Sequence, residues 1–288
     1  PRWRDNRLWI SDMHGHKVHT IDANGNTDTI AEVPNQPSGL GWLPDGSLVV
    51  VSMLDRKLMK INEGNLSLHS DMSHLTPFQC NDMVIAKDGT AYVGNFGADN
   101  AEINIKKTSL IAVSPEGKAK ICASDLLFPN GAVITEDGRE LIVGETFGGT
   151  LTSFKISKPG ELINKSNWAN VMPKRYQIIT SIIRFLNISL KESSNVPFPV
   201  PDGICLDADY GIWVASPTTS EVIRYKKGGQ ITDRIATPNP AYACMLGGEN
   251  GKELYILTAE SSVPQFCKEN KTGEIYKVSV SNERAGQP

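Results

Sequence analysis

The stretch that decides the fold runs from Ser38 to Ser52 and reads SGLGWLPDGSLVVVS. It opens with a small turn residue and a short apolar segment, turns at Asp45-Gly46, and ends in the apolar segment Leu48-Val49-Val50-Val51. An Asp-Gly pair between two apolar segments is a strong signal of a β-hairpin, because glycine adopts a positive φ without a Cβ clash. The β-branched residues of the second segment favour a strand. The stretch therefore predicts one tight β-hairpin.

The same pattern recurs along the whole chain. The other copies are NDMVIAKDGTAYVGN from Asn81, NGAVITEDGRELIVG from Asn130, DGICLDADYGIWVAS from Asp202, ACMLGGENGKELYIL from Ala243 and a shortened PRWRDNRLWISD from Pro1. Their turns lie about 40 to 50 residues apart, the size of a four-stranded propeller blade, except for one longer gap between Asp137 and Asp209. We therefore predict an all-β fold, a six-bladed β-propeller that forms a single domain over residues 1–288.

Two alternatives to this architecture are a pair of β-sandwiches and an open meander, but so regular a repeat is not expected in either. The last predicted strand, Gly273 to Val278, has no hairpin of its own. We expect it to complete a blade shared with the N-terminal segment and so to close the ring without exposed edges.

The longer gap contains a helical pattern. Apolar residues follow helical spacing at Ile178, Ile179, Ile182, Ile183 and Leu186. Pro173 precedes this pattern and a Ser- and Pro-containing stretch follows it, so we predict a short helical insertion between blades at residues 173–197. It is expected to pack on the propeller, to cover the channel mouth or to form a dimer contact.

Composition narrows the classes of function. The chain has 288 residues, 40% of them hydrophobic and 21% charged, with a net charge of -3. This is typical of a soluble globular protein, and no basic excess points to nucleic acid or to a membrane. The five scattered cysteines form no CxxC pair, which favours free thiols in a reducing compartment. We expect a cytoplasmic monomer or homodimer.

One position of the repeat carries the candidate chemistry. Seven residues before each turn stand Ser38, Asn81, Asn130, Asp202 and Ala243. Equivalent repeat positions lie at one height around a propeller, so these side chains are expected to meet at one mouth of the channel. Asn81, Asn130 and Asp202 bring oxygen donors, which suit Ca²⁺, Mg²⁺ or Mn²⁺ better than zinc. The alternative is that each residue serves only its own turn.

The strings PRW, CNDM, FPNG and PDGICLDA resemble the site signatures of the regucalcin/gluconolactonase (senescence marker protein, SGL) family of propeller lactonases. The resemblance covers nearly the whole chain except the helical insertion. It implies that Asn130 and Asp202 bind one divalent ion, most readily Ca²⁺, with Mg²⁺, Mn²⁺ and Zn²⁺ as alternatives. It also implies a third ligand, a Glu expected just before Pro1.

The resemblance further implies substrate-binding roles for three residues. Asn81 matches a family Asn close to metal and substrate. Gln79 stands where family members often carry an Arg that grips sugar lactones, a departure that argues for a different lactone or ester. An acidic substrate-binding residue is expected near Asp99.

These assignments predict a metal-dependent hydrolase that opens a lactone. A divalent ion would polarise the ester carbonyl, and Asp202 would act as the catalytic general base. The alternative is a non-catalytic propeller that binds a ligand or calcium, since propellers serve as general scaffolds. A metal-free strictosidine-synthase-like enzyme fits the Asn and Asp residues less well.

Overall fold

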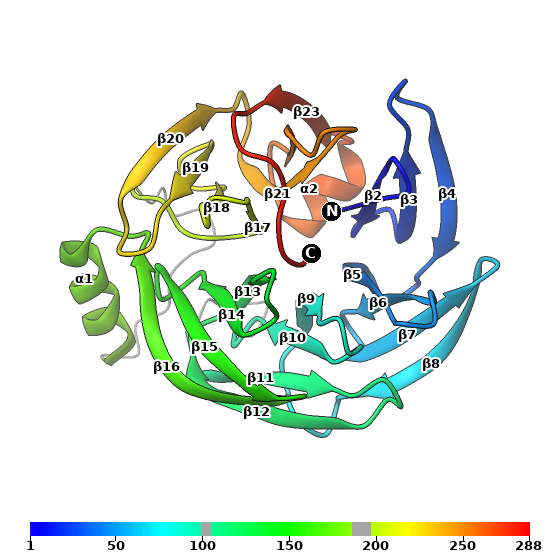
Figure 1. Cartoon of the computed structure of the whole chain (residues 1–288), viewed down its shortest axis with the longest axis horizontal. Coiled ribbons are helices and arrows are strands. Elements are labelled where there is room, and N and C mark those ends of the chain that lie inside the picture. Colours follow the sequence, from blue (N-terminus) through cyan, green and yellow to red (C-terminus); the bar gives the residue numbers. More distant parts are fainter. Residues whose placement is uncertain (99–104, 186–196) are drawn as a thin grey trace.

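The computed structural model describes residues 1–98, 105–185 and 197–288. Six antiparallel sheets are arranged in a ring, each made from consecutive strands, as Figure 1 shows. The six-bladed β-propeller predicted from the repeat is therefore confirmed. That all of residues 1–288 form one domain remains a prediction.

The first three blades are built from strands with the following bounds. Blade 1 contains β1 (Arg2–Arg4), β2 (Arg7–Asp12), β3 (Lys17–Ile21) and β4 (Thr27–Glu32). Blade 2 contains β5 (Pro37–Trp42), β6 (Leu48–Ser52), β7 (Lys57–Asn62) and β8 (Asn65–Asp71). Blade 3 contains β9 (Cys80–Ile85), β10 (Ala91–Asn95), β11 (Thr108–Val113) and β12 (Ala119–Leu126).

The remaining blades complete the ring. Blade 4 contains β13 (Pro129–Ile134), β14 (Glu140–Glu145), β15 (Thr150–Lys158) and β16 (Glu161–Asn170). Blade 5 contains β17 (Ile204–Leu206), β18 (Ile212–Ser216), β19 (Glu221–Tyr225) and β20 (Ile231–Ala236). Blade 6 has the three strands β21 (Ala241–Gly247), β22 (Glu253–Thr258) and β23 (Glu274–Ser279).

The expected sharing of a blade between the two ends of the chain is wrong. The last strand, β23, pairs with β22 inside blade 6, and the N-terminal segment starts the separate blade 1. The two blades meet instead through side chains, because the Trp3 ring stacks on the Tyr255 ring with centroids 5.1 Å apart. Packing, rather than a shared hydrogen-bonded sheet, joins the first and last blades.

The hairpin turns that defined the repeat have the backbone they require. Gly46, Gly89, Gly138 and Gly251 have φ values between 70° and 89°. In the first blade the turn is made by Asp5 and Asn6, both also at positive φ, as a type I′ hairpin demands. These turns fix the register of the two inner strands of each blade. They therefore also fix how far along the channel the candidate site residues lie, seven positions before each turn.

The core lies between neighbouring blades. In β6, Val49 and Val51 pack in the cluster shared with blade 3, whereas Leu48 and Val50 pack in the cluster shared with blade 1. Side chains of a strand point alternately to opposite faces of its sheet, so a strand covered on both faces is apolar throughout. This explains the unbroken run from Leu48 to Val51, which is buried along its whole length.

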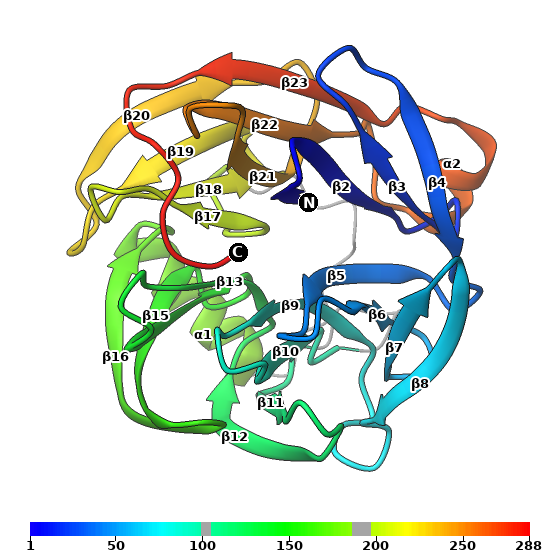
Figure 2. The ribbon, with the colours of Figure 1, turned by 45° about the vertical axis from the view of Figure 1, so that its right-hand side comes forward.

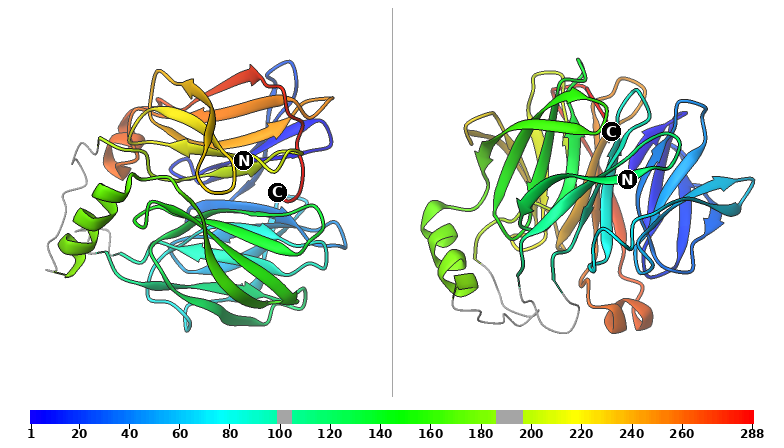
Figure 3. Two further views of the ribbon diagram at one scale, coloured as in Figure 1. Left: turned by 60° about the vertical axis from the view of Figure 1, so that its left-hand side comes forward. Right: turned by 90° about the horizontal axis from the view of Figure 1, so that it is seen from below.

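The helical insertion is confirmed as α1 (Lys174–Phe185), which lies between blades 4 and 5. A second helix, α2 (Pro264–Glu269), joins β22 to β23. Both helices lie on the face where the innermost strands begin, here called the upper face (Figure 3). The rest of the predicted insertion, up to residue 196, falls outside the described residues. Within the described parts of the chain, no helix is long and apolar enough to span a membrane.

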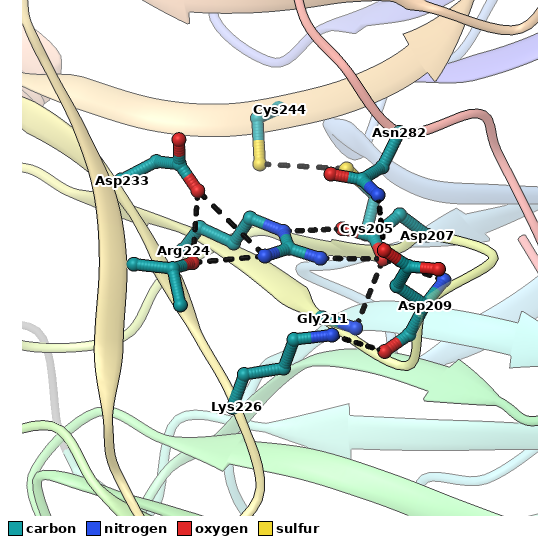
Figure 4. A network of polar contacts seen from close by, with 10 residues as sticks. Cys205, Asp207, Asp209, Gly211, Arg224, Lys226, Asp233, Cys244 and Asn282 are labelled. Carbon is teal, nitrogen blue, oxygen red and sulfur yellow. Dashed lines mark hydrogen bonds and ion pairs between the residues drawn. The ribbon is translucent and has the colours of Figure 1, made fainter.

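The opposite, lower face carries a buried ion pair in blade 5 (Figure 4). The guanidinium of Arg224 donates to both carboxylate oxygens of Asp207, at 2.6 and 3.0 Å, and both residues are almost fully buried. Asp207 also accepts the backbone N–H groups of Asp209 and Gly211. One carboxylate thus holds the β17–β18 turn to β19.

Candidate metal and substrate site

The site is formed where four innermost strands begin at the upper face. The hydroxyl of Ser38 donates to Oδ1 of Asn81 at 3.0 Å, and the amide of Asn81 donates to Oδ1 of Asn130 at 2.8 Å. The amide of Asn130 then donates to Oδ1 of Asp202 at 2.8 Å. The structure therefore brings the equivalent position of blades 2, 3, 4 and 5 into one hydrogen-bonded chain that ends on a carboxylate.

Close approach of the blades makes this chain possible. A Cβ atom on Gly131, the residue after Asn130, would lie 2.5 Å from the backbone oxygen of Asp202. The backbone N–H of Gly131 donates to that same oxygen at 3.3 Å. Only glycine lets the innermost strands of blades 4 and 5 come this near, so the Gly in FPNG has a structural reason.

Thr146 supports the pair formed by Asn130 and Asp202. Its hydroxyl accepts a hydrogen bond from the Asn130 amide at 3.1 Å and donates to the backbone oxygen of Pro201 at 2.7 Å. Thr146, directly after β14, thereby helps to orient the amide of Asn130 toward Asp202. Sequence reasoning missed Thr146, which the repeat could have indicated only through its position directly after a second strand.

The carboxylate of Asp202 lies in an environment that favours its neutral form. Loss of hydration raises the pKa of Asp202 from its ordinary value of 3.8 to about 7. The hydrogen bond from Asn130 acts in the opposite direction, and the negative charge of Asp82 raises the pKa further. The backbone N–H of Gly203 also lowers the pKa, but loss of hydration outweighs both hydrogen bonds.

Asp82 is a second acidic residue near the channel that sequence reasoning did not single out. It occupies the place that glycine takes in three other blades, at Gly39, Gly131 and Gly203. Its Oδ1 accepts a hydrogen bond from Arg2 at 3.1 Å, which links blade 3 to blade 1. An aspartate at a position that is glycine in three other blades is the sequence feature that could have indicated Asp82 as a candidate.

The other predicted substrate residues are placed as follows. Gln79 directly precedes β9, its backbone oxygen accepts the N–H of Phe96 at 3.1 Å, and its side chain makes no hydrogen bond to a described residue. Asp99 lies outside the described residues. Asn95 and Glu145, which end second strands near the mouth, have structural partners: Asn95 contacts Thr108 and Ser109, and Glu145 accepts from the Leu127 N–H.

The donors at this mouth fit a hard divalent cation. Among the described residues no group of three or more His, Cys, Asp or Glu side chains could hold a metal ion. An ion here would be held by the carboxylate of Asp202 and by amide and water oxygens, a set that suits Ca²⁺ or Mg²⁺ and not Zn²⁺. Asn130 could take part by turning its amide oxygen toward the ion, away from Asn81.

Fold and site together define a six-bladed propeller with a cluster of oxygen donors at one mouth of its channel. Residues 1–260 match the family described as SMP-30/Gluconolactonase/LRE-like region, and the chain belongs to that family.

Individual relatives are similar over part of the chain. Regucalcin from Xenopus laevis is 31% identical over 84 residues and human regucalcin is 30% identical over 84 residues. Each match covers 28% of this chain and 28% of the relative's own length.

Solved structures are similar over most of the chain. A calcium-binding regucalcin from Agrobacterium tumefaciens has a TM-score of 0.77 at 18% identity, over 100% of this chain and 91% of that one. A gluconolactonase from Xanthomonas campestris has a TM-score of 0.68 at 22% identity, over 90% and 82% of the two chains. At these identities the likeness supports the fold alone.

Proposed function

We propose that the protein is a divalent-metal-dependent hydrolase that opens a lactone or a related ester. The observation that carries the proposal is the Asp202 carboxylate at the channel mouth. It accepts a hydrogen bond from Asn130 at 2.8 Å and has a pKa of about 7. Two similar proteins, a regucalcin and a gluconolactonase, are named for calcium binding and for lactone hydrolysis respectively.

The chain's own residues divide the work in this proposal. Asp202 and Asn130 would hold the ion, which would supply Lewis-acid polarisation of the ester carbonyl. Asp202 also accepts the proton of the attacking water. Asn81, one hydrogen bond further along the chain, orients the lactone. Gln79 is neutral where an Arg would favour sugar lactones, so we propose a different lactone as substrate.

The experiment is a pH-stat assay of a panel of γ-lactones, δ-lactones, sugar lactones and aryl esters. The protein is stripped with EDTA and then supplied with Ca²⁺, Mg²⁺, Mn²⁺ or Zn²⁺ in turn. We expect acid release from at least one lactone, only after an ion is restored. Asp202→Asn should abolish it, whereas Glu249→Gln, which removes an exposed carboxylate outside the site, should not.

The alternative function is a propeller that binds calcium or another ligand without catalysis. It is supported by the small number of charged groups at the site, since Asp202 is the only carboxylate in the hydrogen-bonded chain among the described residues. Calcium binding without turnover of any compound in the panel, with any of the four ions, would favour this alternative and contradict the hydrolase.

A further inference from the structure

The lower end of the channel contains a cavity that the proposed reaction does not use. Its volume is about 290 Å³, and the innermost strands of blades 1, 2 and 3 form its walls. The C-terminal segment lies across this face, where Gln287 exchanges two backbone hydrogen bonds with Ile134, at 2.7 and 2.8 Å. Figure 2 shows this segment, in red, running from β23 toward the centre of the ring. The cavity is thus lined by residues far apart in sequence and is open to solvent on one side.

The charged side chains that line the cavity are all cationic. Arg2, Arg4, Lys87 and Arg284 line it, and no Asp or Glu side chain does. Lys87 donates only to the backbone oxygen of Glu136, and Arg284 only to that of Trp3. Neither cation forms an ion pair with a residue that the structure describes. Arg2 is paired with Asp82 at 3.1 Å, and Arg4 with the exposed Asp5 at 3.4 Å. The unpaired charges of Lys87 and Arg284 still create a positive potential that attracts anions.

Arg2 gives the strongest indication of a missing partner. Its side chain is 7% exposed, and its terminal nitrogens donate to Asp82, Pro1 and Met83. The Nε atom is buried and has no hydrogen-bond partner. A buried donor without a partner is costly, and most such groups in proteins are satisfied by protein, water or ligand.

The remaining walls are apolar and aromatic. Leu40, Trp42 and Ile85 line the same cavity, and the guanidinium of Arg4 lies 4.8 Å from the Trp42 ring centroid. Small-molecule sites combine such apolar walls with a few polar groups that fix orientation. A ligand that fits both features has an anionic end for the guanidinium groups and an apolar body for the wall.

We propose that this cavity is a binding site for a small organic carboxylate, held by Arg2, Arg4 and Arg284 at its charged end and by Trp42 and Ile85 along its apolar body. A planar carboxylate matches the fork of a guanidinium group, which can donate two parallel hydrogen bonds to it. The volume restricts the ligand to small acids, because pockets for drug-sized molecules span about 300–1,000 Å³. The site is independent of the proposed reaction at the upper mouth.

The test is isothermal titration of the full chain with benzoate at low ionic strength. Benzyl alcohol serves as the neutral probe with the same ring, and inorganic phosphate as the anion without an apolar body. The variants are Arg4→Gln and Arg284→Gln, with Arg139→Gln as the control, because Arg139 is an exposed cation in a turn on the same face. Thermal melting of each variant establishes that it is folded.

We expect benzoate to bind with one site per chain, more tightly than phosphate, and benzyl alcohol not to bind. Arg4→Gln and Arg284→Gln should each weaken benzoate binding about tenfold, since hydrogen bonds to charged groups are strong, whereas Arg139→Gln should leave it unchanged. Binding should persist in Asp202→Asn. The proposal is overturned by an absence of benzoate binding, by equal binding of the alcohol, by tighter binding of phosphate, or by loss of binding in Asp202→Asn.

Discussion

The side-chain amide of Asn130 donates a hydrogen bond of 2.8 Å to the carboxylate of Asp202, although 72 residues separate the two. The helical insertion lies between them in sequence, yet the ring places blades 4 and 5 side by side. The bond joins a neutral candidate ligand, Asn130, to the one carboxylate among the described residues of the Ser38–Asn81–Asn130–Asp202 hydrogen-bonded chain.

Replacing Asp202 by Asn should remove high-affinity calcium binding. The variant keeps the shape of the side chain and an oxygen that can accept from Asn130, but it lacks the negative charge. Loss of one partner of a buried charge pair costs about 2–5 kcal/mol, so the dissociation constant should rise at least about 30-fold. Calorimetric titration with Ca²⁺ measures it, with Glu249→Gln as the matched control; an unchanged constant would exclude Asp202 as a ligand.

Calcium affinity should depend on pH through Asp202. A proton and a cation compete for the same carboxylate, and the pKa of Asp202 in the metal-free protein is about 7. The apparent affinity should therefore rise about tenfold per pH unit below pH 7 and level off above it. Titrations at several pH values check this, and a flat profile between pH 5 and 7 would show that Asp202 does not titrate there.

The stability of the metal-free protein should show the opposite trend. The pKa of Asp202 rises from 3.8 to about 7 on folding, so between these values the folded protein holds a proton that the unfolded chain has released. Its contribution to stability is then full below about pH 4 and is lost as the pH rises to about 7. Urea unfolding at pH 5 and pH 8 should show a drop that Asp202→Asn lacks, while the histidines titrate in both proteins.

Gly131→Ala should damage the site through the backbone. The new Cβ would lie 2.5 Å from the backbone oxygen of Asp202 and must push blades 4 and 5 apart. We expect a loss of about 1–3 kcal/mol in the free energy of unfolding, the usual cost of overpacking, together with loss of calcium binding. Gly273→Ala is the control, since no atom lies within 4 Å of its Cβ position. Equal behaviour of the two variants would contradict the close approach.

Arg224→Gln should destabilise the protein without altering the upper site. It leaves Asp207 buried and without its cationic partner, which costs about 3–5 kcal/mol. The exposed pair between Arg234 and Glu221 provides the comparison, because Arg234→Gln should cost about 1 kcal/mol or less. Urea unfolding measures both variants, and calcium affinity of the folded Arg224→Gln protein should equal that of the unaltered chain.

The parts of the fold that local sequence dictates could be predicted. Asp45-Gly46 and its equivalents specify tight turns, and counting back from them gives Asn81, Asn130 and Asp202, which the structure links by hydrogen bonds. The partner of the last strand could not be predicted in this way. Pairing of β23 with β22 depends on strands separated by α2, and no turn residue marks it.

Contacts across the channel were equally inaccessible to sequence reasoning. Arg2 and Asp82 are 80 residues apart and belong to blades that are not neighbours. The sequence repeat identifies residues that are equivalent in all blades. Arg2 and Asp82 each occur in one blade only, so the repeat does not indicate that they pair. The cavity lined by Arg4, Lys87 and Arg284 is likewise formed by separate blades and the C-terminal segment. No local sequence pattern around these residues indicates that they share a cavity.

The most direct test of metal-dependent hydrolysis is the rate of lactone opening measured against bound metal per chain. Metal-free protein is titrated with Ca²⁺, and bound ion and acid release are recorded on the same samples with the lactone that the panel identifies. We expect the rate to rise in proportion to occupancy and to reach its plateau at one ion per chain, and we expect Asp202→Asn to show neither. Lactone opening that is independent of occupancy, or that persists in Asp202→Asn, would contradict metal-dependent hydrolysis.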